Sequence, residues 1–202
     1  MIEVKNLTKT FGEVCVFKDL SFNIDNGEFV VFSGKSGCGK TTMLNLIGGI
    51  DTPDSGEILV DGADITKQKN RIEYFRNKVS FLFQNFALID NKTVEENLNM
   101  VKKNTRTDTT IEQALESVGL KDKIKAKVYT LSGGEQQRVA LARIMIKKCS
   151  IILADEPTGS LDRENATGVM EILKRLNDEG KTVILVTHDE GLKKAGSRII
   201  EL

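Results

Sequence analysis

The residues with the clearest chemical purpose lie at 34–41, where the sequence matches the pattern G-x-x-x-x-G-K-[ST] at every fixed position. Glycines let the backbone curl so that its N–H groups face inward around a phosphate. A helix that begins at Lys40 directs the positive end of its dipole at the same place. Lys40 then reaches the β- and γ-phosphates, and the Thr41 hydroxyl is placed to bind Mg²⁺. The segment therefore predicts a site for a nucleoside triphosphate.

This pattern lies where the motif requires it, after a continuous apolar run at 29–32 and before a helix expected at 40–47. A chance glycine-rich turn is the alternative, and the placement disfavours it. By itself the pattern indicates only a P-loop NTPase, a class that includes kinases, GTPases and helicases. The residues expected to contact the nucleotide are Gly34, Lys35, Ser36, Gly37, Cys38, Gly39, Lys40, Thr41 and Thr42.

A second chemical element is the hydrophobic strand expected at 151–155, which ends in two acids. A buried strand would bring Asp155 to a metal ion beside Thr41, directly or through water. We expect Glu156 to point elsewhere, because side chains alternate along a strand, and to act as general base toward a water molecule. The alternative is a strand with a polar end at the surface, which the neighbouring phosphate-binding pattern makes less plausible.

The segment 131–138 reads Leu-Ser-Gly-Gly-Glu-Gln-Gln-Arg and predicts the start of another helix. Ser132, Gly133 and Gly134 would offer backbone N–H groups and a hydroxyl to an anion, which makes a second phosphate-binding element in one chain. The plain alternative is a helix cap, with Ser132 and Glu135 forming a capping box. Both interpretations can hold together.

With this segment the chain resembles the ATP-binding subunits of ABC transporters over essentially its whole length. Each short motif is weak alone, but the set occurs in that family's order and is highly specific. The matching features are the Walker A loop at 34–41, the Q-loop residue Gln84, the signature at 131–135, the Walker B strand at 151–156, the D-loop at 160–162 and the switch residue His188.

The resemblance implies that two copies of the chain close around two ATP molecules. In this family the signature, here Ser132, Gly133, Gly134 and Glu135, contacts the γ-phosphate of the ATP held by the other subunit. ATP and Mg²⁺ are thus the expected cofactors, and a homodimer forms on ATP binding. ATP occupancy closes the dimer and hydrolysis releases it.

Two further polar residues gain roles from the resemblance. Gln84 would touch Mg²⁺ and line the groove that receives a membrane permease, although a surface amide at a strand end is the plain alternative. His188 would hydrogen-bond the γ-phosphate and hold Glu156 and the water in place. The plain alternative is a histidine in the core or at the surface whose hydrogen bonds are satisfied within the fold. The residues expected in catalysis are Lys40, Gln84, Glu156 and His188, and the expected metal ligands are Thr41, Gln84 and Asp155.

The adenine-stacking position departs from the family's commonest residue, which is tyrosine. Here the candidate is Phe11, which keeps the stacking face and lacks only the hydroxyl. Core packing is the competing role for this ring.

The transported substrate is indicated only through one branch of the family. Residues 156–162 read Glu-Pro-Thr-Gly-Ser-Leu-Asp and resemble the branch that serves lipoprotein release, macrolide and peptide export, and cell division. Residues 84–97 are the stretch expected to meet the permease, and they resemble bacteriocin-exporter ATPases. Export of a peptide, bacteriocin or lipophilic substrate is the expectation. The alternatives are a cell-division or mechanotransmission ATPase, a scaffold with little turnover, and a nucleic-acid or ribosome factor.

The sequence predicts strands at 79–83, 151–155, 183–187 and 198–202, and helices at 71–77, 162–179 and 190–195. This alternation of strands and helices predicts an α/β fold with a P-loop core and a mostly parallel sheet. The N-terminal strands, expected at 2–7 and 17–24, favour an antiparallel β-subdomain beside it. Residues 84–148 carry apolar residues at helical spacing and are expected to form an inserted helical subdomain. We expect one domain over 1–202, with 1–83 and 149–202 forming the β-subdomain and core.

Composition narrows the expected partners. Lys plus Arg and Asp plus Glu both number 29, so the net charge is zero and a nucleic-acid partner is not expected. No apolar run is long enough to span a bilayer, so membrane attachment at the cytoplasmic face would come through the permease. Three widely spaced cysteines suit neither a zinc site nor a disulfide framework. The lysines at 121, 123, 125 and 127 are expected on a solvated face, with anionic lipid as the alternative.

Overall fold

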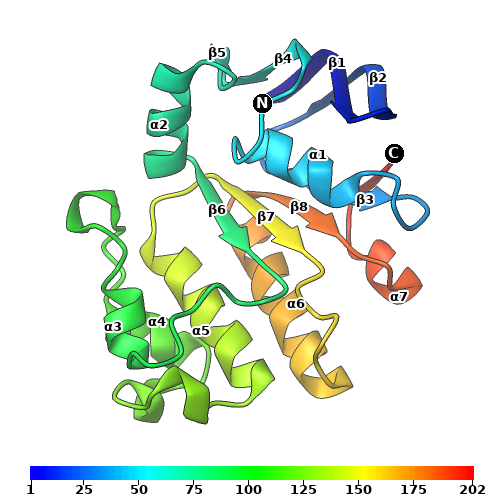
Figure 1. Cartoon of the computed structure of the whole chain (residues 1–202). Helices are drawn as coiled ribbons and strands as arrows, with labels where there is room; N and C mark the ends of the chain where they lie inside the picture. Colours follow the sequence, from blue (N-terminus) through cyan, green and yellow to red (C-terminus); the bar gives the residue numbers. More distant parts are fainter.

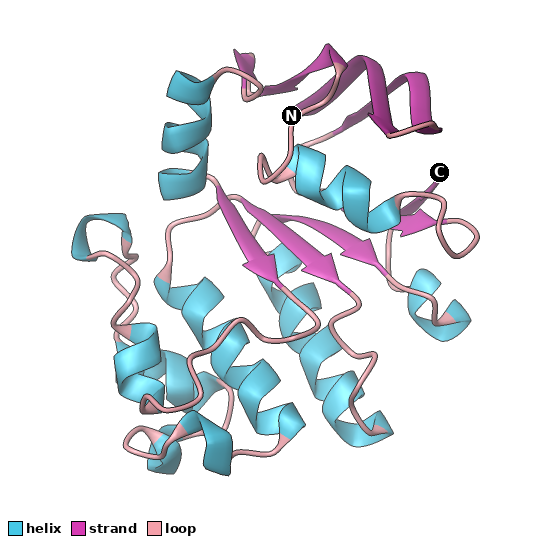
Figure 2. Ribbon diagram, in the orientation of Figure 1, coloured by secondary structure: helices cyan, strands magenta, loops and turns pink.

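The computed structural model describes residues 1–202, with the exception of the Glu190 side chain, and contains two sheets and a group of helices (Figures 1 and 2). The strands are β1 (Ile2–Phe11), β2 (Val14–Ile24), β3 (Phe29–Ser33), β4 (Ser55–Val60), β5 (Ala63–Asp64), β6 (Val79–Leu82), β7 (Ile151–Asp155), β8 (Thr182–Val186) and β9 (Arg198–Glu201). The α-helices are α1 (Lys40–Ile47), α2 (Gln68–Asn77), α3 (Val94–Leu98), α4 (Ile111–Ser117), α5 (Gly133–Ile146), α6 (Arg163–Asp178) and α7 (Glu190–Lys193).

The central sheet is parallel and has the strand order β6-β7-β8-β3-β9. Its three middle strands are apolar and buried on both faces, because α1 covers one face while α5 and α6 lie against the other (Figure 1). The predicted α/β class, with its parallel core, is confirmed. The predicted strand at 183–187 is shifted by one residue relative to β8, and Thr187 lies just beyond it.

A second sheet, antiparallel, has the order β2-β1-β4-β5 and lies above α1 in Figure 1. The Phe22 ring of β2 meets the Phe32 ring of β3 edge-on, with centroids 5.9 Å apart. This contact joins the antiparallel sheet to the parallel one. The Asn26-Gly27 turn accordingly connects strands of two different sheets.

The segment 84–148 is helical, as its spacing of apolar residues predicts. It contains α3, α4 and α5, with short 3₁₀ turns between them, and among its described residues the only β pairing is two isolated bridges. Thr93, Thr110 and Ser132 each form a capping box at a helix start, which satisfies backbone N–H groups there. The apolar side chains predicted to face inward are all buried: Leu98, Val101, Ile111, Leu115, Val118 and Leu120.

The boundaries of three helices differ from those expected, and α6 also ends one residue early, at Asp178. Helix α2 begins at Gln68, three residues before the expected Arg71, because its first turn is polar and carries no apolar rhythm. Asp162 caps α6 and lies outside it, since its side chain accepts the backbone N–H of Asn165. Helix α7 ends at Lys193, before the expected Ala195.

The lysine run lies on the surface, and each of its four ammonium groups has an acidic neighbour. The pairs are Lys121 with Glu116, Lys123 with Glu135, Lys125 with Glu95 and Lys127 with Glu96. This local neutralisation fits the predicted solvated face. None of the helices in the described chain is long and apolar enough to cross a bilayer.

The ring contact between the two sheets leads to a stability prediction. Phe32 is 0% exposed, so Phe32→Ala removes a buried ring and leaves a cavity between the sheets. We expect a loss of about 4 kcal/mol in the free energy of unfolding, measured by urea titration. Val14→Ala, on a strand of the same region but with Val14 65% exposed, is the control and should change stability by less than about 0.5 kcal/mol. Equal losses for both variants would contradict the packing described.

Candidate active site

The parallel sheet gathers the predicted chemical residues at one edge. Residues of neighbouring strands stand in register, so that Leu82 pairs with Ala154, Asp155 with Val186, and Val186 with Phe32. The loops that follow these strands therefore leave the sheet side by side. They carry Gln84 after β6, Glu156 after β7, His188 after β8 and the glycine-rich segment 34–41 after β3.

The glycine-rich segment curls around the start of α1. Gly39 caps the helix in a left-handed conformation, with φ of 98°, and supplies no side chain to occupy the backbone N–H groups. Lys40 is only 5% exposed, and its ammonium donates to the carbonyls of Gly34 at 2.9 Å and Lys35 at 3.0 Å. These bonds fix a positive charge over a helix N-terminus, which is the arrangement that binds a phosphate.

Strand β2 packs directly on this segment. A Cβ atom built on Gly39 would lie 2.6 Å from Cζ of Phe17 and would also overlap Val16, so only glycine allows this approach. The antiparallel sheet is thereby held beside the phosphate-binding loop. Phe11, at the end of the β1–β2 hairpin, is 51% exposed, and the Lys9 ammonium lies 4.9 Å from the centre of its ring. Phe11 is thus a surface aromatic of this sheet, not part of the core.

The oxygens of Thr41 and Asp155 lie in a geometry that suits a small divalent cation. Thr41 Oγ1 donates to Asp155 Oδ1 at 3.2 Å. Two adjacent ligands of an octahedral Mg²⁺, each about 2 Å from the metal, would be separated by about 3 Å. Burial raises the pKa of the Asp155 carboxyl, while the bond from Thr41 acts in the opposite direction. A hydroxyl and a carboxylate of this kind fit the hard, oxygen-seeking ion.

Glu156 and His188 form a polar pair beside this oxygen pair. His188 Nε2 lies 2.8 Å from Glu156 Oε1, and the Glu156 N–H donates to the carbonyl of Val186 at 2.9 Å. Strand β7 ends at Asp155, and Glu156 has a left-handed φ of 43°. Glu156 therefore lies outside the strand, so the alternation of side chains expected within the strand does not apply to this residue. A left-handed glutamate is strained, which is common where a side chain must be aimed.

Gln84 lies at the border of a cavity of about 370 Å³, which is lined by Phe83, Gln84, Asn85, Phe86, Asp155 and Ser160. Gly159 lies against the same amide, since a Cβ built there would be 3.3 Å from Gln84 Nε2 and 3.5 Å from Glu156 Oε2. Gln84 is thus brought to the acidic end of β7, as a shared site with Asp155 and Glu156 requires.

The loop after Gln84 is held by an arginine that sequence reasoning missed. Phe86 and Ala87 both have left-handed backbones, with φ of 61° and 49°. Arg143 of α5 donates to their carbonyls at 3.0 and 2.6 Å, and burial lowers the pKa of its guanidinium. No local signal reveals this contact, because the partners are 56 and 57 residues apart in the sequence.

The signature segment lies away from the rest of the site. In Figure 1 the start of α5 is at the lower edge of the molecule, and α1 is in the upper half. Ser132 and Glu135 form the predicted capping box, with bonds of 2.7 and 3.2 Å, and the Ser132 N–H holds the pKa of Glu135 below its ordinary value. One copy of the chain therefore brings together Lys40, Asp155, Glu156, His188 and Gln84. The start of α5, which carries the signature, lies apart from α1 (Figure 1).

Comparison with known proteins shows the family of the chain. The family model described as ABC transporter matches residues 17–159. An uncharacterized ABC transporter ATP-binding protein of Methanocaldococcus jannaschii, MJ1508, is 42% identical over 213 residues, which cover 100% of this chain and 95% of that protein. The chain belongs to the ABC transporter family.

Other similar proteins include a macrolide exporter and a cassette of known structure. The macrolide export ATP-binding/permease protein MacB of Campylobacter jejuni is 40% identical over 209 residues, covering 100% of this chain and 33% of MacB, so the chain spans about one third of that relative. A dimeric structure of the cassette MJ0796 has a TM-score of 0.87 at 40% identity, covering 100% of this chain and 94% of that one. A post-hydrolysis dimer of MJ0796 bound to ADP and Pi has a TM-score of 0.86. The chain is an ABC-type ATP hydrolase.

The buried ammonium over the α1 N-terminus predicts the origin of nucleotide affinity. Lys40→Ala removes the charge that the Gly34 and Lys35 carbonyls hold in place, and we expect ATP affinity to fall at least roughly 100-fold. Isothermal titration calorimetry measures this directly. Lys69→Ala, at an exposed position of α2, is the control and should bind ATP as the unmodified chain does. Unchanged affinity in Lys40→Ala would exclude the loop as the phosphate site.

Proposed function

We propose that the chain is the ATP-binding subunit of an export-type ABC transporter, dimerising around two Mg-ATP and driving a separate membrane permease. The observation that carries this proposal is the separation of two anion-binding helix starts. Lys40 begins α1 beside the acids at the end of β7, while Ser132 caps the exposed start of α5. Figure 1 shows α1 in the upper half of the molecule and the start of α5 at its lower edge. A second copy, turned head to tail, would supply the missing half. The dimeric structures of the similar cassette MJ0796 support this arrangement.

The hydrolytic step would use the residues at the sheet edge. Mg²⁺ between Thr41 and Asp155 would neutralise charge on the phosphates. Lys40 holds the γ-phosphate, and Glu156 accepts a proton from the water that attacks it. As the new P–O bond forms, the bond to the β-phosphate oxygen breaks, giving ADP and phosphate. His188, 2.8 Å from Glu156, would hold that carboxylate in its orientation, and Gln84, in the loop after β6, would contact Mg²⁺.

The permease is proposed to dock on an apolar groove between α2 and the loop that follows α3. The groove has a volume of about 310 Å³, and its apolar lining includes Phe75, Met100 and Val101, with Met100 55% exposed. Arg143, which holds the loop after Gln84, lines the same groove. Arg76, Lys102, Arg143 and Lys147 also line the groove, so it would fit an apolar helix end of a membrane protein that carries an acidic residue at its rim.

The neighbouring segment 84–97 supports the same docking face. Asn97 is buried, and its amide exchanges hydrogen bonds with the backbone of Ile89, at 2.7 Å from the Ile89 N–H and 3.1 Å to its carbonyl. This loop is therefore tied to α3 and presents a fixed surface. Docking there would hold the chain at the cytoplasmic face of the membrane. The likeness to MacB, which its name describes as a macrolide exporter with its own permease, favours a lipophilic or peptide cargo.

The dimer is tested by stalling hydrolysis. Glu156→Gln removes the proton acceptor and leaves the phosphate-binding loop intact, so turnover should fall at least roughly 100-fold while Mg-ATP shifts the protein to a dimer on size-exclusion chromatography. Adding Ser132→Arg to this variant places a bulky cation at the exposed helix start and should abolish the dimer, with ATP binding by the monomer retained.

Ser150→Arg is the matched control, because Ser150 is exposed and precedes β7 at the other end of that strand. It should leave the dimer of Glu156→Gln unchanged. A stalled protein that stays monomeric with saturating Mg-ATP would refute the proposed function. A dimer that survives Ser132→Arg would refute the role of the signature.

The docking groove makes a separate prediction. Met100→Lys adds a fifth cation to a groove that Arg76, Lys102, Arg143 and Lys147 already line, and it should prevent co-purification with the permease from detergent-solubilised native membranes, because burying an unpaired ammonium is costly. ATP affinity should be unaffected. Ile199→Lys, at an exposed apolar position of β9, is the control and should retain the permease. Loss of the permease in both variants, or in neither, would speak against this groove.

A further inference from the structure

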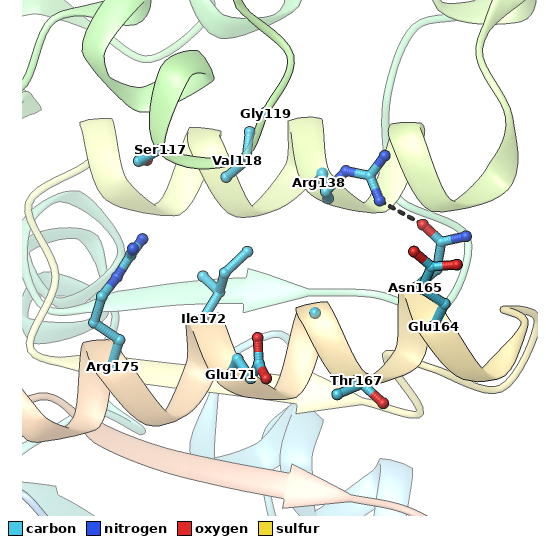
Figure 3. A pocket seen from close by; sticks show the side chains of 11 residues that line it. Ser117, Val118, Gly119, Arg138, Glu164, Asn165, Thr167, Glu171, Ile172 and Arg175 are labelled. Carbon is cyan, nitrogen blue, oxygen red and sulfur yellow. Dashed lines mark hydrogen bonds between the residues drawn. The ribbon is translucent and has the colours of Figure 1, made fainter.

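A chain of hydrogen bonds joins the starts of α5 and α6 through one side chain, Asn165 (Figure 3). Arg138 of α5 donates from its guanidinium to Asn165 Oδ1. Asn165 Nδ2 donates to Asp162 Oδ2 at 2.7 Å, and the Asn165 backbone N–H donates to Asp162 Oδ1 at 2.9 Å. One residue thus holds both carboxylate oxygens of Asp162, in the D-loop, and is itself held by the signature helix.

The two helix starts are also packed closely at this point. A Cβ atom built on Gly134 would lie 2.9 Å from Asn165 Nδ2 and closer still to the other amide atoms. Gly134 therefore lets α5 approach Asn165, and any larger residue there would push the amide away from Arg138 and Asp162.

Beyond this bridge lies a groove of about 900 Å³, bordered by α6 on one side and by residues 117–119, at the end of α4, on the other. Figure 3 shows Arg138 and Asn165 at one end of the groove, with Ile172 and Arg175 farther along α6. The Asn165 bridge is therefore a polar contact between the two helix starts at this end of the groove.

A second bond from α5 reaches the other end of the D-loop segment. Gln137, which is fully buried, donates through Nε2 to the carbonyl of Pro157 at 2.7 Å. Pro157 follows Glu156 directly. The segment 157–162 is thus held by α5 near its start through Gln137 and at its end through Asn165.

We propose that Asn165 is a positioning residue that makes the signature helix and the D-loop one rigid unit, so that the D-loop moves with the signature when the signature contacts the partner subunit's ATP. This inference rests on the proposed head-to-tail dimer. The simpler role for Asn165 is to donate its backbone N–H to Asp162, the N-cap residue of α6. That cap uses the backbone N–H of residue 165, which any substitution except proline retains, so the side chain is free to serve the bridge.

The test uses the Glu156→Gln protein, whose Mg-ATP dimer can be measured by sedimentation. Asn165→Ala in this background removes the bonds to Arg138 and Asp162, and we expect the dimer dissociation constant to rise about tenfold. ATP affinity of the monomer should stay within about twofold, because the phosphate-binding loop is untouched. The control is Thr167→Ala, which lines the same groove and loses only a bond within α6, from Oγ1 to the Arg163 carbonyl.

A double-mutant cycle separates positioning from simple stability. If Asn165 acts through Arg138, then Asn165→Ala should weaken the dimer much less in an Arg138→Ala background than alone. Full additivity, or an Asn165→Ala dimer as tight as that of Thr167→Ala, would overturn the inference and leave the proposed dimer standing. A Glu156→Gln parent that never dimerises would overturn both.

Discussion

Two helix starts that a single rigid chain cannot bring together govern the rest of this molecule. Each N-terminus offers backbone N–H groups to an anion, one at Gly39 and one at Ser132. Between them lie a parallel sheet buried on both faces and the core side chains of α5, including Val139 and Leu141. Folding one start onto the other would expose this core. In the proposed assembly, the complementary half-site therefore comes from a second copy.

The charges around the signature are compatible with the binding of an anion there. The Glu135 carboxylate completes the cap of α5, which places a negative group where a phosphate of the partner would approach. Lys123 lies 3.8 Å from that carboxylate, and Arg138 stands one turn further along the helix. These cations offset the carboxylate, so the helix dipole still favours an incoming phosphate. The cap and the phosphate contact are therefore compatible.

The sequence was most informative where structure is local. The bounds of α1 and β7 are as expected. Glycines flank α1, while β7 is a continuous apolar run that is soon followed by a proline. The start of α2 was not foreseen, since Gln68, Lys69 and Asn70 carry no apolar pattern and Lys67 is a poor cap. Contacts such as Arg143 with Ala87, or Arg138 with Asn165, depend on how elements pack across long separations. The left-handed backbone of Glu156 likewise has no signal in the residue itself, because glutamate rarely adopts it.

Helix α5 connects the signature, the D-loop, the loop after Gln84 and the proposed docking groove. Its start carries the signature, Arg138 reaches the D-loop through Asn165, and Arg143 holds the loop after Gln84. Its last residues reach the apolar groove, which Arg143 and the adjoining Lys147 both line. A helix of 14 residues is about 21 Å long and moves as one body. In the proposed assembly, a permease that shifts the groove must therefore shift the signature with it, and closure of the dimer on ATP must move the permease in return.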